Sequence, residues 1–567
     1  MSKKIIIVGG VAGGATAAAR IRRLDEQAEI IVFERSGFVS YANCGLPYYI
    51  GGVIQDKEEL TLQTPENFRE RFRIDVRVRH EVTAIHPDKK TVSVKNLKTG
   101  EEFEENYDKL LLSPGARPVQ PNLPGVGIDN LFTLRTVEDT LRIREFVLKE
   151  KPKSAVLAGG GYIGLEVAEN LRELGMDVTI VQRPNQVLNP LDYEMATFVH
   201  AKMREKGIHL MLGHSVEGFE QKDGKTMVIL KDGEPLKTDM VILAIGVAPD
   251  TRLAKDAGIS LGIKNSIVVN ERMETSVPDI YAVGDAVEVH HRITGQKALI
   301  SLAGPANKQG RIAADNICGG NSSYKGSQGS SVIKIFDMTV ATTGLNEQAA
   351  KQAGIDCDKV YLSPSSHASY YPGGTMMTMK VLFEKETYRL LGAQIIGYDG
   401  VDKRIDVLAT AMAAGMSALE LQDLDLAYAP PYSSAKDPVN MAGFMIDNIE
   451  TGTLKQFFWD EVGELPDDGS VVLLDTRTTE EYGRGHINGF VNIPLDELRE
   501  RIGEIRRGLP VYVMCQSGLR SYLSCRILAQ NGFDCYNFSG GYRLYETIYR
   551  DCVAAKQSYP CGMDKIN

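Results

Sequence analysis

Two cysteines stand where the neighbouring residues favour sulfur chemistry, and the first is Cys44. It lies in the segment FVSYANCGLPY and is the only cysteine before Cys318. With no second thiol nearby in the sequence, a Cys44 thiolate would act alone. It would attack a sulfur–sulfur bond and hold a mixed disulfide, or cycle through a sulfenic acid. An inert buried cysteine is the alternative, and the motif favours the redox thiol.

The second is Cys515, which begins the pattern CQSGLRS directly after the apolar run Val511–Met514. A short loop between a strand and a helix lets several backbone N–H groups face the sulfur. These donors and the helix N-terminus depress a thiol pKa and stabilise a persulfide. Arg520 closes the loop and is placed to hold an anionic substrate. The sequence therefore predicts an activated thiol at Cys515.

A glycine-rich loop near the start predicts a phosphate site. Residues 9–14 are GGVAGG, and glycines there allow a tight turn and a close approach of the backbone to a pyrophosphate at a helix N-terminus. Val11 stands where the middle glycine of G-x-G-x-x-G is usual. Glu34, 20 residues after Gly14, is placed to bind ribose hydroxyls.

A second loop, GGGYIG at residues 159–164, matches G-x-G-x-x-G in full. The strand expected after its helix ends in Gln182 and Arg183, where a carboxylate usually selects NADH. Arg183 is either a contact for the 2′-phosphate of NADPH or a solvated surface charge. Both nicotinamide cofactors therefore stay candidates.

These loops need βαβ units to position them. Lys4–Phe33 and Ala155–Val181 each predict a strand, a glycine turn, a helix and a strand. Ile280–Asp285 predicts a further strand that ends in Gly-Asp and returns the chain to the first fold.

The later chain changes pattern. Residues 331–452 predict four strands (SVIKIF, VATTGL, MKVLFE, LLGAQIIG) and an apolar helix over Ile405–Ala414, typical of an α+β domain. After a linker expected near residues 449–454, Val471–Asp475 begins a small α/β unit.

Composition narrows the function classes. A chain of 567 residues exceeds one hydrophobic core, so several domains are expected. The net charge of −10 gives no footprint for nucleic acid, and no apolar stretch reaches membrane-spanning length. The eight cysteines show neither metal-site pairs nor a dense disulfide framework, which predicts a reducing cytoplasm and no metal.

With its two glycine loops, its Gly284-Asp285 strand and its lone Cys44, the chain up to about residue 450 resembles the pyridine nucleotide–disulfide oxidoreductases. The segment around Cys44 is similar to the single-cysteine branch of that family. The branch contains coenzyme A–disulfide reductases, persulfide and polysulfide reductases, and water-forming NADH oxidases. The resemblance implies FAD, and NADH or NADPH, as cofactors.

The resemblance also implies the fold class and the domains. The fold class is α/β, with two Rossmann-like dinucleotide-binding domains, an α+β dimerisation domain and a C-terminal α/β rhodanese domain. The expected bounds are 1–112 with 248–325 for FAD, 113–247 for NAD(P)H, 326–450 for dimerisation and 454–555 for the rhodanese-like domain.

The cofactor residues that the resemblance assigns lie at turns and strand ends. Asp285 bonds the ribityl chain of FAD, and NAD(P)H lies near Tyr162 and Glu166. The joins SPGA at 113–116 and AIG at 244–246 are similar to the family's domain-crossing segments. The assigned residues are Gly9, Val11, Gly14, Glu34, Arg35, Val82, Ser113, Gly115, Gly159, Gly161, Tyr162, Gly164, Glu166, Gln182, Arg183, Gly246, Asp285 and Ala303.

The coenzyme A branch implies substrate-binding residues, most of them near the start of the chain. The branch's residues that hold the nucleotide end of coenzyme A correspond by resemblance to Thr16, Arg20 and Arg23 in this chain. Its residues that flank the thiol correspond to Ser40 and Asn43. The branch has a lysine near position 72, where this chain has Phe72 between Arg71 and Arg73, so Arg71 is the candidate replacement. Asn307 stands where some relatives have a histidine.

The α+β domain adds candidate catalytic phenols. By resemblance, Tyr370 and Tyr428 reach the thiol of a partner subunit and protonate the leaving thiolate, and Lys436 contacts coenzyme A. Core packing is the alternative for either tyrosine, and Tyr371 and Tyr432 are close rivals. A homodimer follows from this resemblance.

Residues 471–550 resemble a rhodanese domain, through Asp475-Thr476-Arg477, Glu481-Tyr482, Gly485-His486-Ile487, the Cys515 loop and Gly540-Gly541-Tyr542. A non-catalytic docking module is the alternative, and retention of Cys515 favours sulfur transfer. Cys525 and Cys535 are expected in the core, whereas the tail cysteines, Cys552 and Cys561, are expected to be exposed.

The predicted function is an FAD-dependent NAD(P)H reductase acting through Cys44 on coenzyme A disulfide, coenzyme A persulfide or polysulfide. The rhodanese domain would handle sulfane sulfur on Cys515. The alternative is a water-forming NADH oxidase that cycles through a sulfenic acid, with the rhodanese unit as a docking module.

Overall fold

The computed structural model describes residues 3–555. Their contacts divide the chain into two compact units, residues 3–185 with 207–329, and residues 186–206 with 330–555. The division does not follow the four predicted domains, whose bounds stay predictions. Within the described residues, no helix is both long and apolar enough to cross a membrane.

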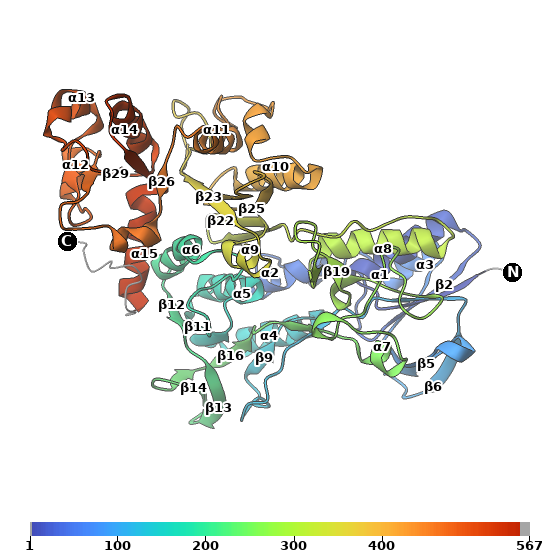
Figure 1. The fold of residues 1–567 in the computed structure, drawn as a ribbon. Helices are drawn as coiled ribbons and strands as arrows, with labels where there is room; N and C mark the ends of the chain where they lie inside the picture. Colours follow the sequence, from blue (N-terminus) through green and yellow to red (C-terminus); the bar gives the residue numbers. More distant parts are fainter. Residues whose placement is uncertain (1–2, 556–567) are drawn as a thin grey trace. The chain divides into compact units, whose positions relative to one another are not determined.

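The first unit contains a five-stranded parallel sheet built on the first predicted βαβ unit (Figure 1). The strands run in the order β18-β7-β1-β2-β3, so the late strand does return to the first fold, as predicted. Helices α1 and α8 pack against each other in this unit. The bounds are β1 (Lys4–Val8), α1 (Ala12–Leu24), β2 (Glu29–Glu34), β3 (Asp75–Val78), β7 (Lys109–Leu112), β18 (Ile280–Ala282) and α8 (Ala303–Ile317).

A second parallel sheet, in the order β12-β11-β10-β16-β9, contains the second predicted βαβ unit. Its strands and flanking helices are β9 (Leu131–Thr133), α4 (Val137–Glu150), β10 (Ser154–Ala158), α5 (Tyr162–Glu173), β11 (Asp177–Gln182), β12 (Ile208–Leu212) and β16 (Met240–Leu243). The two predicted crossing segments meet side by side, because β8 (Ala116–Pro118) pairs antiparallel with β17 (Val247–Pro249).

Shorter elements complete this unit. Two antiparallel three-stranded sheets, absent from the sequence-based expectations, extend from the parallel ones. Further elements of this unit are η1 (Asn43–Gly45), α2 (Leu46–Gly51), α3 (Pro65–Phe72), β4 (His80–His86), β5 (Thr91–Asn96), β6 (Glu102–Asn106), β13 (Val216–Lys222), β14 (Lys225–Leu230), β15 (Leu236–Thr238), α7 (Arg252–Asp256) and η5 (Gly284–Ala286).

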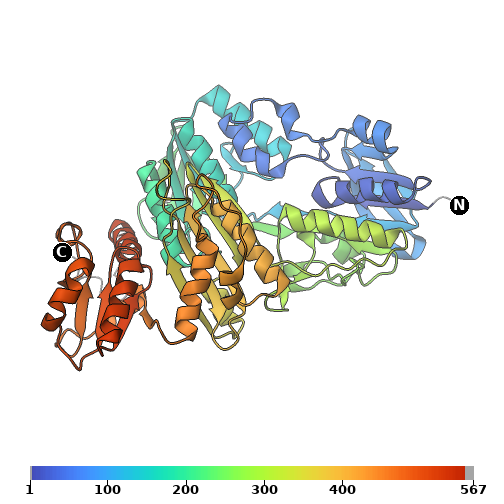
Figure 2. The same ribbon diagram turned by 90° about the horizontal axis from the view of Figure 1, so that it is seen from above.

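The second unit contains an antiparallel sheet in the order β21-β22-β25-β24-β23 (Figure 2). The four predicted strands and the apolar helix are present, and β23 is an additional strand. The bounds are β21 (Ser331–Ile335), β22 (Met338–Gly344), α9 (Glu347–Gln352), β23 (Cys357–Leu362), β24 (Thr378–Glu384), β25 (Leu390–Gly397), α10 (Val401–Ala414) and α11 (Pro438–Glu450).

A buried ion cluster ties α6 (Tyr193–Glu205) to this antiparallel sheet. Lys380 is 1% exposed, and its Nζ lies 2.6 Å from Asp192 Oδ2, 2.5 Å from Glu194 Oε1 and against Glu347. The three carboxylates keep the pKa of Lys380 above its usual value although burial opposes them. Such a cluster fixes α6 strongly, since an uncompensated charge here would be costly.

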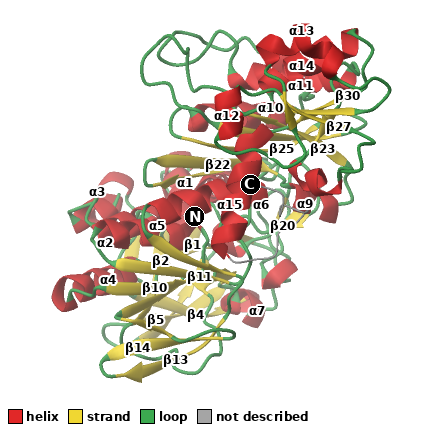
Figure 3. Cartoon of the chain, turned by 90° about the vertical axis from the view of Figure 1, so that its left-hand side faces the viewer, coloured by secondary structure: helices red, strands yellow, loops and turns green. Residues whose placement is uncertain are grey.

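The rhodanese-like region of the same unit is a parallel sheet in the order β26-β30-β29-β27-β28, flanked by helices (Figure 3). The first strand of the region therefore lies at one edge, beside the last. The bounds are β26 (Gln456–Phe457), β27 (Val472–Asp475), α12 (Thr479–Gly483), β28 (Val491–Asn492), α13 (Leu498–Arg501), β29 (Val511–Met514), α14 (Leu519–Gln530), β30 (Cys535–Phe538) and α15 (Gly541–Ala555).

Helix α15 is anchored on α6 by a buried polar network. His200 Nε2 accepts a hydrogen bond from the Val187 N–H at 3.1 Å, so its Nδ1 carries the proton and donates to Asp551 at 3.0 Å. Tyr193 and Arg204 also donate to the Asp551 carboxylate. The rhodanese-like region is thereby held to the antiparallel sheet through α6.

Candidate active site

The first glycine loop is built for close backbone approach. Gly9 has φ +96°, and a Cβ there would lie 2.1 Å from the Ser113 carbonyl oxygen. A Cβ on Gly14 would lie 1.9 Å from the Gly9 carbonyl oxygen. Val11 caps α1 without a side-chain hydrogen bond, so the first N–H groups of the helix are left for another acceptor. This cradle fits the pyrophosphate of a dinucleotide.

Glu34 supports the same loop from the end of β2. Its carboxylate accepts hydrogen bonds from Gly10 N and Ser36 N, both at 2.8 Å. Burial raises its pKa despite these bonds. The neighbouring Arg35 pairs with Asp250 at 2.9 Å. Glu34 therefore fixes the first glycine loop, and its binding of ribose hydroxyls stays a prediction.

The turn after β18 carries an ion pair that the sequence did not reveal. Arg135 Nη2 donates to Asp285 Oδ2 at 2.6 Å, across 150 positions of sequence. Gly284 N donates to Gln309 Oε1 at 2.7 Å, which joins the turn to α8, the helix that begins at Ala303. The sequence gives no signal that Arg135 pairs with Asp285, because an arginine outside any motif is most often a surface residue.

Four other predicted cofactor residues are placed by backbone hydrogen bonds or by core packing. Gly115 O accepts from Asp250 N, and Gly246 O accepts from Val119 N, both at 3.0 Å, so the two crossing segments are bonded together. Val82 lies in the core beside the first sheet and is 5% exposed. Ser113 N donates to Val8 O at 2.8 Å, beside the first glycine loop.

The second glycine loop repeats the construction of the first. A Cβ on Gly159 would lie 2.3 Å from Ala244 O, and one on Gly164 would lie 2.1 Å from Gly159 O. Gly160 N donates to Gln182 Oε1 at 2.9 Å, the bond that Glu34 makes in the first loop. Gly161 caps α5, Tyr162 begins it, and Arg183 is exposed just beyond β11. The loop fits a second dinucleotide.

Cys44 lies on the one-turn helix η1 and is exposed. The protein around it displaces water and raises the pKa of its thiol, the Glu166 carboxylate adds to this, and the Arg135 guanidinium opposes it. Burial raises the pKa of Glu166 to about 7, and Tyr48 is hydrogen-bonded to that carboxylate. Tyr48 was not predicted. The thiol therefore lies near a carboxyl group that titrates close to neutrality.

The predicted coenzyme A residues of the first unit fall into three settings. Thr16 Oγ1 donates to Asn307 Oδ1 at 2.6 Å, and Arg20 pairs with Asp315 at 2.7 Å. Ser40 has φ +48°, and the Asn43 Oδ1 is buried with no hydrogen-bond partner among the described residues. Arg23, on α1, and Arg71, on α3, are exposed.

In the second unit, the phenols of Tyr370 and Tyr428 are hydrogen-bonded to each other, although 58 positions of sequence separate them. This bond raises the pKa of Tyr428. Both are exposed, at 72% and 45%, so core packing does not explain them. Lys436 is exposed in the following segment. Tyr371 instead stacks edge-on against His367.

Cys515 is fully buried at the end of β29. Its Sγ accepts hydrogen bonds from Gly518 N at 3.1 Å and from Ser521 Oγ at 3.3 Å. Tyr542 N donates to Cys515 O at 2.8 Å, which ties the loop to the start of α15. A Cβ on Gly541 would lie 2.7 Å from Cys515 O, so glycine is needed there. One backbone N–H, that of Gly518, faces the sulfur together with the Ser521 hydroxyl, where several N–H donors were predicted.

Arg520, predicted to hold an anionic substrate, is paired within the protein. Its Nη1 and Nη2 donate to the two oxygens of Glu481 at 2.6 and 2.8 Å. The hydrogen bonds from Arg520 lower the pKa of Glu481 to about 2. Glu481 stood in the predicted motif, but its pairing with Arg520 was not foreseen.

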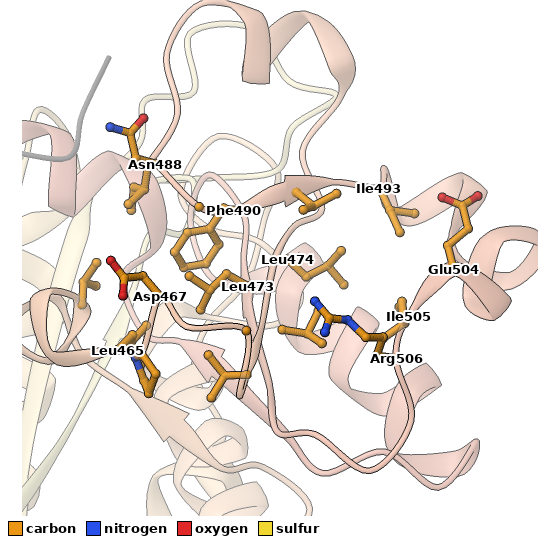
Figure 4. Close-up of a pocket in the computed structure, with 18 of the residues that line it drawn as sticks. Leu465, Asp467, Leu473, Leu474, Asn488, Phe490, Ile493, Glu504, Ile505 and Arg506 are labelled. Atoms are coloured by element: carbon orange, nitrogen blue, oxygen red, sulfur yellow. The ribbon is translucent and has the colours of Figure 1, made fainter.

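A separate cavity of about 610 Å³ lies in the rhodanese-like region (Figure 4). Figure 4 shows apolar side chains such as Leu473, Leu474 and Phe490 around it, with Arg506 and Glu504 at one end. Among the residues that the structure describes, none that lines it belongs to the loop 515–520. The cavity is therefore not the entrance to Cys515.

The remaining cysteines differ from expectation at one position. Cys525 and Cys535 are buried, as predicted, and the Cys535 Sγ donates to Cys525 O at 3.2 Å. Cys552 was expected to be exposed, but it is 1% exposed because α15 packs on α6, where Tyr193 OH lies 3.5 Å from its Sγ. The Cys561 prediction lies outside the described residues.

Comparisons with known families agree with this arrangement. A family model for pyridine nucleotide-disulphide oxidoreductases matches residues 3–310. The dimerisation domain of the same family matches residues 330–438, and a rhodanese-like domain matches residues 458–547. The predicted fold class is confirmed.

Individual proteins are similar over long stretches. Coenzyme A disulfide reductase of Staphylococcus aureus (strain JH9) is 39% identical over 78% of this chain and 99% of its own length. The structure of reduced Bacillus anthracis CoADR-RHD covers 97% of this chain and 99% of its own, with a TM-score of 0.95 and 48% identity.

A NAD-dependent persulfide reductase from A. fulgidus covers 96% of this chain and 100% of its own, with a TM-score of 0.90 and 38% identity. The two structural matches cover nearly the whole chain, whereas the Staphylococcus aureus match covers 442 residues of it. The chain belongs to the pyridine nucleotide–disulphide oxidoreductases and carries a rhodanese-like domain after its dimerisation domain.

Proposed function

We propose that this enzyme uses NAD(P)H and FAD to reduce the sulfur–sulfur bond of coenzyme A disulfide, coenzyme A persulfide or polysulfide. The observation that carries the proposal is Cys44, an exposed lone thiol beside Glu166, in the unit that contains both glycine loops. The similarity to a coenzyme A disulfide reductase and to a persulfide reductase supports it.

The residues of the chain perform the sulfur steps. The Cys44 thiolate bonds to one sulfur of the substrate's sulfur–sulfur bond (the coenzyme A sulfur in the coenzyme A substrates), that bond breaks, and the other sulfur leaves as a thiolate or hydrosulfide. When bound at the first glycine loop, FAD would supply the two electrons from NAD(P)H that restore the Cys44 thiolate. Glu166 can take or give a proton near neutral pH because its pKa lies at about 7.

A homodimer completes the proposed site. Tyr370 and Tyr428 form a phenol pair that can donate a proton to a leaving thiolate, and they lie in the region that matches the dimerisation domain. Each pair would serve the Cys44 of the partner subunit. Thr16, Arg20, Arg23, Arg71 and Lys436 are the proposed contacts for the phosphates of coenzyme A.

We further propose that the rhodanese-like domain transfers sulfane sulfur through Cys515, in a cytoplasmic enzyme. Two hydrogen-bond donors already face the Cys515 sulfur, an arrangement that a docking module would not need. A persulfide formed there would present its outer sulfur to an acceptor. Cys515 and Cys44 would then act on the same pool of sulfane sulfur.

The test is anaerobic consumption of NADH and NADPH by the FAD-loaded enzyme with each of the three sulfur substrates. A parallel aerobic reaction contains no sulfur substrate. Turnover with a sulfur acceptor that disappears in Cys44→Ser is the expected result and would rank both the donors and the acceptors. Turnover only with oxygen would instead establish the NADH oxidase alternative.

A further inference from the structure

The loop around Cys515 carries a closed charge pair. Arg520 is the one cationic residue in the sequence CQSGLR that forms the loop. Its two terminal nitrogens are bound to the two oxygens of Glu481, a bidentate pairing, and Glu481 Oε2 also accepts from Thr478 N at 2.9 Å. The guanidinium charge is thus compensated inside the protein.

A second nearby cation, Arg477, is committed in the same way. It is 1% exposed and pairs with Asp475 at 2.7 Å. Its Nη2 also donates to Gly485 O at 2.8 Å, and its guanidinium lies 3.9 Å from the centre of the Tyr542 ring. Arg477 therefore supports the base of the loop and does not supply an open charge to a substrate.

The groups that donate hydrogen bonds to the Cys515 sulfur are neutral. The donors to Cys515 Sγ are the Gly518 N–H and the Ser521 hydroxyl. Beside Arg520, Leu519 and Leu523 are exposed at 65% and 43%. They stand four residues apart on α14 and so share one face. These exposed leucines next to Arg520 offer an apolar contact to the carbon chain of an organic thiol, which a small inorganic dianion cannot use.

We propose that Glu481 determines the donor class of Cys515, selecting persulfides of organic thiols over dianionic donors such as thiosulfate. The inference rests on the proposed sulfur transfer by Cys515. In the favoured step, the Cys515 thiolate bonds to the outer sulfur of R–S–SH, the sulfur–sulfur bond breaks, and R–S⁻ leaves, giving Cys515–S–SH. With thiosulfate, the leaving group is sulfite, and the guanidinium groups of Arg520 and Arg477 are already paired with carboxylates when its two charges develop.

The test follows loading of Cys515 in the full-length, FAD-loaded Cys44→Ser protein, so that reduction at Cys44 cannot remove the product. The persulfide of 2-mercaptoethanol, which carries at most one negative charge, and thiosulfate are the donors, and mass spectrometry with peptide mapping measures the added sulfur at Cys515. We expect faster loading from the persulfide by about tenfold or more, the size of one charge-assisted contact. Glu481→Gln should raise the thiosulfate rate by about tenfold and leave the persulfide rate within about twofold.

Two variants serve as controls. Thr478→Ala removes the hydroxyl that accepts from Glu481 N at 3.2 Å but leaves the pairing with Arg520, so selectivity should not change. Adding Arg520→Gln to Glu481→Gln should abolish the gain with thiosulfate. Equal loading from both donors, or an unchanged thiosulfate rate in a folded Glu481→Gln protein, would overturn the inference. Loading from neither donor would instead overturn sulfur transfer by Cys515.

Discussion

The two cysteines proposed to handle sulfur occupy opposite environments. Cys44 is exposed on a single helical turn. Loss of solvation around its thiol raises the pKa of that thiol, and the Glu166 carboxylate raises it further. Cys515 is fully buried, and two donors bond to its sulfur. The difference fits two tasks, because a thiol that forms a mixed disulfide with a large substrate needs space, whereas a thiol that stores one sulfur atom needs donors.

Removing each of the two sulfur atoms in turn has the largest expected effect and tests whether Cys44 and Cys515 act separately. Cys44→Ser should lower NAD(P)H-dependent reduction of sulfur–sulfur bonds by about a thousandfold or more, as expected for loss of a nucleophile, and leave loading of Cys515 intact. Cys515→Ala should show the reverse pattern. Stopped-flow NADH oxidation and mass spectrometry measure the two activities. Loss of both activities in either variant would mean that the sites are not separable.

The Cys515 loop packs so closely against Gly541 that a side chain does not fit there. Gly541→Ala would place a Cβ 2.7 Å from Cys515 O and 2.8 Å from Ser517 N, at φ +64°. We expect loading of Cys515 to fall by about 10- to 100-fold, since strain of about 1–3 kcal/mol must be relieved by moving the loop. NADH oxidation through Cys44 should not change.

Gly532→Ala is the matched control for this substitution. Gly532 also has a positive φ, +82°, in the same region, but no atom lies within 4 Å of its added Cβ. It carries the backbone strain without the collision. Equal losses in the two variants would show that strain, and not contact with the loop, is responsible.

The phenol pair tests whether the reductase site extends to the dimerisation domain. Tyr370→Phe or Tyr428→Phe should lower kcat for reduction by about tenfold, because each removes one member of a proton-donating pair and leaves the other. Tyr432→Phe, at a 71% exposed side chain, is the control. An unchanged kcat in both variants would restrict the reductase site to the first unit.

The smallest expected effect concerns the charge beside Cys44. Ionised Glu166 disfavours the thiolate, so Glu166→Gln should lower the Cys44 pKa and speed alkylation by iodoacetamide at pH 8 by about threefold. In the wild type, alkylation rises with pH through a midpoint above the ordinary thiol value. Glu173→Gln, exposed on the same helix, should leave that midpoint unchanged. An unshifted midpoint in Glu166→Gln would rule out this electrostatic coupling.

Patterns that are local in sequence were predictable. Both βαβ units formed where glycine turns followed apolar runs, because a strand, a turn and a helix are encoded within about 30 residues. The Cys515 loop was predictable for the same reason. The tail was not: Cys552 follows no apolar pattern that reveals which partner covers it, and α6 buries it.

Sequence alone determined the positions of the two candidate thiols, the two glycine loops and the order of the domain types, since each is carried by a short run of residues. Only the tertiary structure decided the partners of the charged groups. Arg135 meets Asp285 across 150 positions, and Arg520 meets Glu481 across 39. Such pairs depend on how the elements pack, and packing is a property of the whole chain that no local pattern encodes.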